Sequence, residues 1–181
     1  MSEDTFTDMM VAEMPYLRAF ALSLSGAASV ADDLVQETLV KAWSHADSFE
    51  RGTNFRAWLV TILRNTYFNQ YRKRSREVQD SDHIHAGQIA VGGGQESSLA
   101  MRDVQRAINM LPADQQEILL MIGVTELSYE EAAQICNIAV GTVKSRLNRA
   151  RARLAELLGL TGDDPATIDR PAEDRKSPQS S

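Results

Sequence analysis

The sequence predicts an all-α protein made of two small helical domains joined by a flexible linker. Apolar residues recur at three- and four-residue steps through most of the chain, whereas strand-like alternation is poor. The 181 residues are 43% hydrophobic and 24% charged, which suits one or two soluble domains. Two stretches lack periodicity and are rich in Gly, Ser, Asp or Pro. The predicted organisation is a first domain over 5–76, a flexible linker over 77–97, a second domain over 98–160 and a disordered tail over 161–181.

The first domain contains three predicted helices. The first ends at Gly26, and Pro15 is expected to kink it or to start a new helix. Ser29 and Asp32 resemble a capping box, which predicts the start of the second helix. A third amphipathic pattern predicts a helix over about 54–74.

The second domain is predicted to be helical throughout. An apolar stripe precedes Pro112, where the chain restarts, and a second apolar stripe follows it. Ser128 and Glu131 form a second capping box, which opens a short helix. Asn137 occupies a turn position that often needs a positive φ, a conformation that Asn tolerates well. The last helix is predicted over about 140–158.

The charge of the chain is unevenly distributed. The formal net charge of −6 by itself argues against a nucleic-acid partner. However, residues 51–76 hold seven bases and no acid, and residues 141–155 hold five bases and no acid. A single basic run is usually a solvated helix face, but two acid-free runs in an acidic protein indicate two nucleic-acid contacts.

The second basic run matches the recognition helix of a helix-turn-helix. Two short helices meet at a tight turn, and at 100° per residue Val143, Leu147, Ala150 and Leu154 face the core. Small and hydrogen-bonding residues then occupy the opposite face with cations along both rims, as a major groove requires. The alternative is a basic surface helix that packs against an acidic partner. The candidate contacts are Thr142, Lys144, Ser145, Arg146, Asn148, Arg149, Arg151 and Arg153.

The first basic run suits unstacked, single-stranded DNA. An aromatic ring, amides and cations share one strip of the predicted third helix, where rings stack on bases, Asn reads base edges and Arg holds the backbone. The alternatives are that Trp58 is a core residue and that the two Asn side chains are ordinary exposed polar groups. The candidate contacts are Trp58, Asn65, Asn69, Arg72 and Lys73.

Three segments in this order resemble the extracytoplasmic-function (ECF) sigma factors, the minimal two-domain promoter-specificity subunits of bacterial RNA polymerase. They are residues 32–43, 55–65 and 128–154, and the resemblance covers about 10–158. They resemble, respectively, the family's polymerase-binding helix, its −10 segment and its −35 helix-turn-helix. Further segments are similar to the general-stress-response group of alphaproteobacteria, namely 53–59, 62–67 and 111–118.

The resemblance implies a role for each matched residue. Asn65 would help capture a flipped base of the −10 element, with Asn69 one turn further on. The positions that would face the −35 element are Lys144, Ser145, Asn148 and Arg149. Those that would dock on the clamp of the polymerase's largest subunit are Asp32, Asp33, Leu34, Gln36, Glu37 and Trp43. The resemblance also implies an anti-sigma factor that buries the inner faces of both domains.

The resulting hypothesis is a non-catalytic transcription initiation factor, monomeric when free, that binds core RNA polymerase and promoter DNA at both elements. It needs no cofactor, because no phosphate-binding Gly-rich loop is present. Nor is a metal expected, because no carboxylate or Cys completes a site around His45, His83 or His85. Cys136 is a small core residue or, as the alternative, a redox switch.

The chain is expected in the cytoplasm and away from the membrane. Its acidic start is unlike a signal peptide, and no apolar run approaches the roughly 18 residues that span a bilayer. Two other functions stay open. One is a sigma-like decoy that sequesters an anti-sigma factor, and the other is an ordinary helix-turn-helix regulator that binds duplex DNA without polymerase.

Overall fold

The computed structural model describes residues 3–80 and 99–160, and within these ranges the regular structure is helical, as predicted. A single 3-10 turn, Ala46–Ser48, follows the second helix. The predicted flexible linker and tail fall almost wholly outside the described residues. The α-helices are α1 (Glu3–Ser25), α2 (Ala28–Ser44), α3 (Phe55–Asp80), α4 (Leu99–Asn109), α5 (Ala113–Thr125), α6 (Tyr129–Cys136) and α7 (Val140–Leu157).

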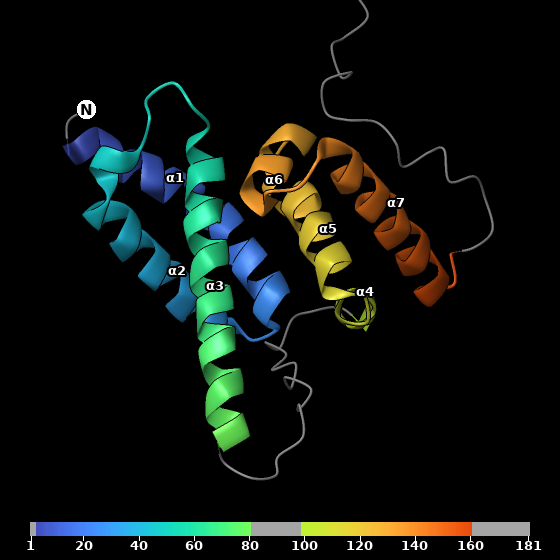
Figure 1. Ribbon diagram of the computed structural model, residues 1–181. Helices are drawn as coiled ribbons and strands as arrows, with labels where there is room; N and C mark the ends of the chain where they lie inside the picture. The colour runs from blue at the N-terminus through green and yellow to red at the C-terminus, as the bar shows by residue number, and fades with distance from the viewer. Residues whose placement is uncertain (1–2, 81–98, 161–181) are drawn as a thin grey trace, which may run out of the picture.

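Helices α1, α2 and α3 pack on one another and form the first unit (Figure 1). Their apolar stripes meet in a core that fully buries Leu17, Phe20, Leu34 and Leu59. Figure 1 also shows that the C-terminal part of α3 projects beyond the other helices. Of the two alternatives at Pro15, the start of a new helix is wrong, since α1 continues through this residue as one helix.

Two predicted helix boundaries differ from the structure. Gly26, at φ 70°, ends α1, and the extended Ala27 leads directly into α2. Because α2 begins at Ala28, Ser29 lies inside the helix and the N-cap has no side-chain hydrogen bond. The capping box predicted there is therefore wrong. In addition, α3 continues to Asp80, beyond its predicted end and into the segment expected to be linker.

The second capping box is confirmed. The Ser128 hydroxyl accepts from the backbone N–H of Glu131 at 3.2 Å, and the Glu131 carboxylate accepts from the backbone N–H of Ser128 at 2.8 Å. At the other end of α6, Asn137 adopts the left-handed conformation predicted for it, with φ 53°. The capping box thus begins α6, and Asn137 begins the turn that leads to α7.

Ser128→Ala is expected to lower the free energy of unfolding by about 1 kcal/mol, because it removes the oxygen that satisfies an orphan N–H of α6. Urea unfolding followed by circular dichroism measures the change. Ser29→Ala is the matched control, because Ser29 is exposed within α2 and caps no helix, so its change should stay within about 0.5 kcal/mol. Equal losses from both variants would contradict the assigned role of the cap.

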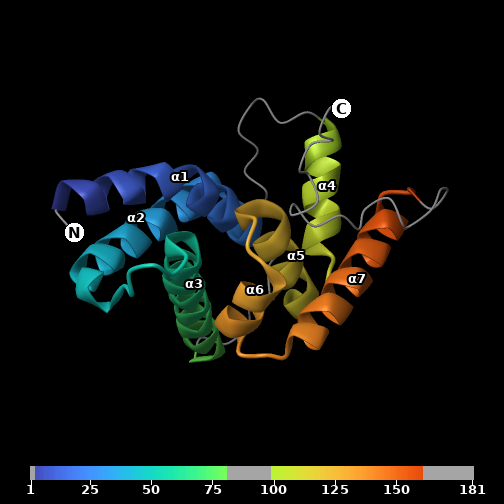
Figure 2. The ribbon, with the colours of Figure 1, turned by 90° about the horizontal axis from the view of Figure 1, so that it is seen from above.

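The second unit packs against the first. Helix α5 lies against α1, and α6 lies against α3, as the view in Figure 2 shows. Most of the buried apolar side chains of both units form one continuous cluster, in which Leu17 and Leu63 belong to the first unit and Ile118 and Met121 to the second. Periodicity predicted the two units but not this contact. No described helix is long and apolar enough to cross a membrane.

Candidate nucleic-acid interface

Helix α7 presents the amphipathic arrangement expected of it. Val143, Leu147 and Ala150 are buried, and Leu154 is partly buried. The opposite side of the helix exposes Asn148 and Arg149, while Thr142 and Ser145 are half-buried. One face of α7 is therefore committed to the core, and the other presents amides, hydroxyls and a guanidinium to solvent.

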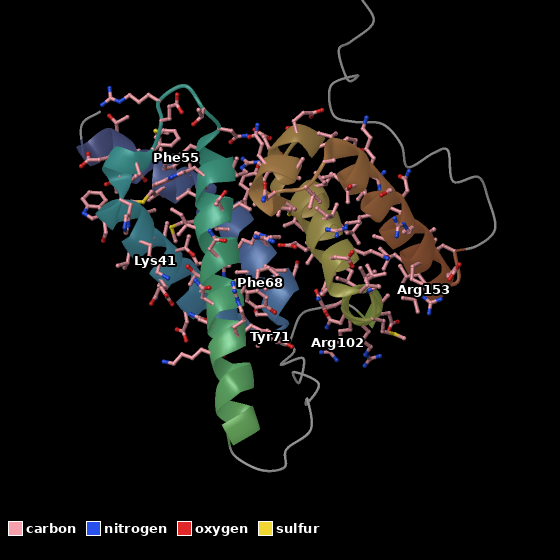
Figure 3. All side chains as sticks on the ribbon, in the orientation of Figure 1. Lys41, Phe55, Phe68, Tyr71, Arg102 and Arg153 are labelled. Atoms are coloured by element: carbon pink, nitrogen blue, oxygen red, sulfur yellow. The ribbon has the colours of Figure 1, made fainter. Side chains whose placement is uncertain are left out.

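The cations on the rims of α7 have internal partners. Arg146 pairs with Asp114 of α5 at 3.1 Å, and Arg153 pairs with Glu156 at 2.8 Å. Figure 3 shows Arg153 near the C-terminal end of α7. Lys144 lies 5.9 Å from the centre of the Tyr129 ring. Because most of these groups are at least partly exposed, their contributions to stability are small and they remain accessible to phosphate.

Arg149 has a weaker internal contact. Its Nη2 donates to the Ser145 hydroxyl at 3.4 Å, and this hydroxyl donates to the Thr142 carbonyl at 3.0 Å. The chain of contacts holds the guanidinium over the first turns of α7, where a recognition helix meets base edges.

On α3, four of the five predicted contacts lie together. Asn65, Asn69, Arg72 and Lys73 are all exposed. Arg72 donates to the Asn69 side-chain oxygen at 3.3 Å, so the amide and the guanidinium already share one patch. Both groups keep further hydrogen-bonding capacity for a base edge or a phosphate. We call these four residues the α3 strip.

Trp58 has different surroundings. Its ring stacks on Phe55 with centroids 5.6 Å apart and also meets Phe6 at 6.2 Å and Phe49 at 5.4 Å. The label in Figure 3 places Phe55 at the start of α3, away from the projecting end of the helix. A half-buried ring held by three other rings fits the core interpretation of Trp58. The sequence could not separate the two roles, because helical spacing puts Trp58 on the same strip as Asn65.

Some of the predicted polymerase-binding residues are exposed on α2, and others are buried and hold α2 in place. Asp33 and Gln36 are exposed, and Asp32 is exposed while paired with Arg18 at 2.8 Å. Leu34 is buried and anchors α2 to the core. The remaining two predicted residues are Trp43, which is 46% exposed and meets Phe6 edge-on, and Glu37, which is partly buried between α2 and α3.

Polar contacts across the boundary between the two units were not predicted from the sequence. Arg64, next to Asn65, donates to the carboxylate of Glu117 on α5, which is only 7% exposed. Asn54, just before α3, donates to Glu131 at 2.6 Å. Gln105 of α4 donates to the Ser23 carbonyl at 3.3 Å.

Arg56 makes the most extensive of these contacts. Its Nε donates to Glu13 at 2.6 Å within the first unit, and its Nη1 donates to the Thr125 carbonyl at 3.0 Å across the boundary. Thr125 is the last residue of α5, so Arg56 satisfies a terminal carbonyl and places a cation at the negative end of the helix dipole. The flanking Glu126 adopts a left-handed conformation and approaches the same guanidinium at 3.4 Å.

Cys136 lies at the same boundary. Burial raises the pKa of the Cys136 thiol to about 11, and the negative charge of Glu117 adds to the shift, whereas Arg64 opposes it. Since the thiolate is the reactive form, the raised pKa favours a packing role for Cys136 over a redox switch. No group of His, Cys, Asp and Glu among the described residues could hold a metal ion. His45 is exposed at the end of α2, and the other two His fall outside the described ranges.

Comparison with known proteins agrees with this architecture. Residues 9–77 match the family model for Sigma-70 region 2, and residues 101–154 match that for Sigma-70 region 4. The ECF RNA polymerase sigma factor EcfG of Rhodopseudomonas palustris (strain TIE-1) is 50% identical over 159 residues, which are 88% of each chain.

Two solved structures extend the comparison. The sigma factor RpoE, crystallised with the anti-sigma factor NepR from Bartonella quintana, is 51% identical with a TM-score of 0.80, over 87% of this chain and 99% of that chain. CnrH, in complex with the cytosolic domain of CnrY, is 26% identical with a TM-score of 0.68, over 89% and 92% of the two chains. Because both regions match in order and EcfG is 50% identical over the 159 aligned residues, the chain belongs to the ECF sigma factor family of RNA polymerase.

Proposed function

We propose that this sigma factor recruits core RNA polymerase to promoters by reading the −35 element with α7 and capturing unstacked −10 bases on the α3 strip. The observation that carries this proposal is the separation of two exposed, cation-bearing surfaces onto two helical units of one acidic chain. Sigma factors are in general initiation factors without an enzymatic activity of their own. Because the proposed work is done on core polymerase, the protein acts in the cytoplasm.

At the −35 element, the solvent-facing side of α7 would enter the major groove. Asn148 and Arg149 carry the donors and acceptors that pair with base edges, because an amide suits adenine and a guanidinium suits guanine. The rim cations, Lys144, Arg146, Arg151 and Arg153, would meet phosphates, which fix the register of the helix without reading sequence.

At the −10 element, the α3 strip would hold non-template bases after they leave the duplex. The exposed amides of Asn65 and Asn69 are available to a flipped base, and Arg72 and Lys73 to its backbone. Capture of such bases offsets the few kcal/mol that unpairing costs, so binding alone drives strand opening. Trp58 is best regarded as support for this helix, given its aromatic neighbours.

Docking on polymerase would use the exposed acidic and amide face of α2, formed by Asp32, Asp33 and Gln36, together with the exposed edge of Trp43.

We further propose that an anti-sigma factor controls this chain and that its target genes belong to a stress response. The similarity to EcfG and to a sigma factor crystallised with NepR supports both parts of this proposal. In the structure the inner faces of the two units pack on each other, so the expected burial of both faces by the partner requires the units to separate.

Run-off transcription tests the proposal. Core polymerase reconstituted with the chain should give promoter-specific transcripts, and substitutions in either promoter element should abolish them. A gel shift without core polymerase is the companion measurement, and weak binding is expected. Tight sequence-specific binding by the free chain would favour an ordinary helix-turn-helix regulator, and anti-sigma binding without any transcript would favour a decoy.

A further inference from the structure

A hydrogen-bond network joins α2 to α3 beneath the α3 strip. The Lys41 ammonium donates to Glu37 Oε1 at 2.6 Å and to the Thr66 hydroxyl at 3.0 Å. The Gln70 amide donates to the other oxygen, Glu37 Oε2, at 2.6 Å. Figure 3 shows Lys41 on α2 on the side next to α3. Both carboxylate oxygens of Glu37 therefore have partners inside the protein.

The position of this network in α3 is informative. Thr66 and Gln70 are one turn apart on the same side of α3, and each directly follows an Asn of the α3 strip, Asn65 or Asn69. Residues one position apart in a helix point about 100° from each other. The hydrogen bonds of Thr66 and Gln70 to α2 fix the rotation of α3 about its own axis. This rotation sets the direction in which the side chains of Asn65 and Asn69 point.

The network is anchored in the core at Thr66, while the side chains of Lys41 and Glu37 are each 41% exposed. Thr66 is only 2% exposed, so the hydroxyl that accepts from Lys41 is held in the core. The Lys41 ammonium lowers the pKa of the Glu37 carboxyl, with a smaller contribution from Gln70. Charge-assisted hydrogen bonds of this kind are shorter and stronger than neutral ones.

We propose that Glu37 and Gln70 are positioning residues for −10 recognition, which hold the base-capturing amides of α3 in register with the polymerase-docking helix α2. The proposal rests on the proposed function of the α3 strip. It also changes the expected role of Glu37, which serves α3 from within the protein and not the polymerase across the interface. Docking of α2 then delivers the −10 surface in a defined orientation.

The test uses two variants in reconstituted holoenzyme. Gln70→Leu removes the amide donor with little change in size. The exchange E37Q/Q70E reverses donor and acceptor: the amide introduced at position 37 accepts from Lys41 through its oxygen and donates through its nitrogen to the carboxylate introduced at position 70. Discrimination is measured as the ratio of open complexes formed on a promoter with the preferred −10 sequence and on one substituted at single −10 positions. Affinity for core polymerase and the unfolding midpoint are measured alongside.

Gln70→Leu is expected to lower −10 discrimination about fivefold, which corresponds to about 1 kcal/mol for one lost hydrogen bond. Core affinity should be unchanged, and E37Q/Q70E should restore discrimination. Normal discrimination in Gln70→Leu, or failure of the folded exchange variant to restore it, would overturn the positioning role. A lower unfolding midpoint alone would show that the network merely stabilises the unit.

Asn65→Ala separates this inference from the proposed function. If Asn65→Ala lowers −10 discrimination and Gln70→Leu does not, the α3 strip reads the element without help from the network. If Asn65→Ala has no effect, the proposed role of the strip itself fails. Glu50→Gln, which alters an exposed carboxylate in the loop before α3, is the control and should leave every measurement unchanged.

Discussion

Arg149→Ala is expected to lower transcription from a promoter with an intact −35 element by about tenfold or more, without weakening the affinity for core polymerase. A bidentate guanidinium contact contributes about 1–3 kcal/mol of base discrimination, and alanine removes it completely. The side chain is exposed on the face of α7 opposite its buried residues, so its loss should leave the fold intact. Run-off transcription with holoenzyme at a concentration that leaves the promoter only partly occupied measures the effect.

The pattern of the loss identifies the kind of contact. Arg149→Ala should relax the preference at one −35 position, whereas loss of a phosphate contact weakens binding to all sequences equally. Arg153→Ala is the matched control, because this arginine lies on the rim and pairs with Glu156. Unchanged promoter output from Arg149→Ala would refute the assignment of α7 as the recognition helix.

Arg64→Ala is expected to make Cys136 react faster with a thiol reagent, by up to about 30-fold. Arg64 holds α3 to Glu117 of α5, and hydrogen bonds to charged groups contribute about 1.5–3 kcal/mol, so their loss raises the ratio of separated to packed units. A loss of about 2 kcal/mol corresponds to about 30-fold in that ratio. The chain has a single cysteine, so the absorbance change of the reagent reports this residue alone.

The direction of the change distinguishes separation of the units from a local electrostatic effect. In the packed arrangement Arg64 lowers the pKa of the thiol, so its removal alone would raise that pKa further and slow the reaction. Separation of the units removes the part of this burial that α3 supplies, which lowers the pKa of the thiol and makes the reaction faster. Arg18→Ala, which breaks an exposed pair between α1 and α2, is the control and should not change the rate. A slower reaction in Arg64→Ala would show that the units stay together.

Local chemistry made much of the fold predictable from the sequence. The capping box at Ser128, the left-handed Asn137 and the buried face of α7 follow from interactions within a few residues of each other. The family resemblance rests on the same local segments. The prediction at Ser29 shows the limit of this approach. Gly26 ends α1 and α2 begins at Ala28, so Ser29 lies inside the helix and not at its N-cap.

The contacts between units were not predictable in this way. Arg64 and Glu117 are 53 residues apart, and each is a residue type normally found in solvent. The network of Lys41 and Gln70 likewise joins two helices whose exposed faces, judged from the sequence alone, look independent. Periodicity shows which face of a helix is polar, but it does not show which polar groups meet.

The internal partners of Arg56 and Arg64 affect how the protein responds to ionic strength. While the units are packed, each guanidinium has a carboxylate of the second unit within hydrogen-bond distance, Glu126 for Arg56 and Glu117 for Arg64. The salt dependence of DNA binding reflects the ions set free when phosphates are neutralised. An arginine that leaves a carboxylate for a phosphate exchanges one ion pair for another, and the abandoned carboxylate recruits a cation from solution. The packed chain therefore has fewer positive charges available to neutralise phosphates than its sequence contains. The affinity of the packed chain for DNA should accordingly fall less steeply with salt concentration than that of the separated units.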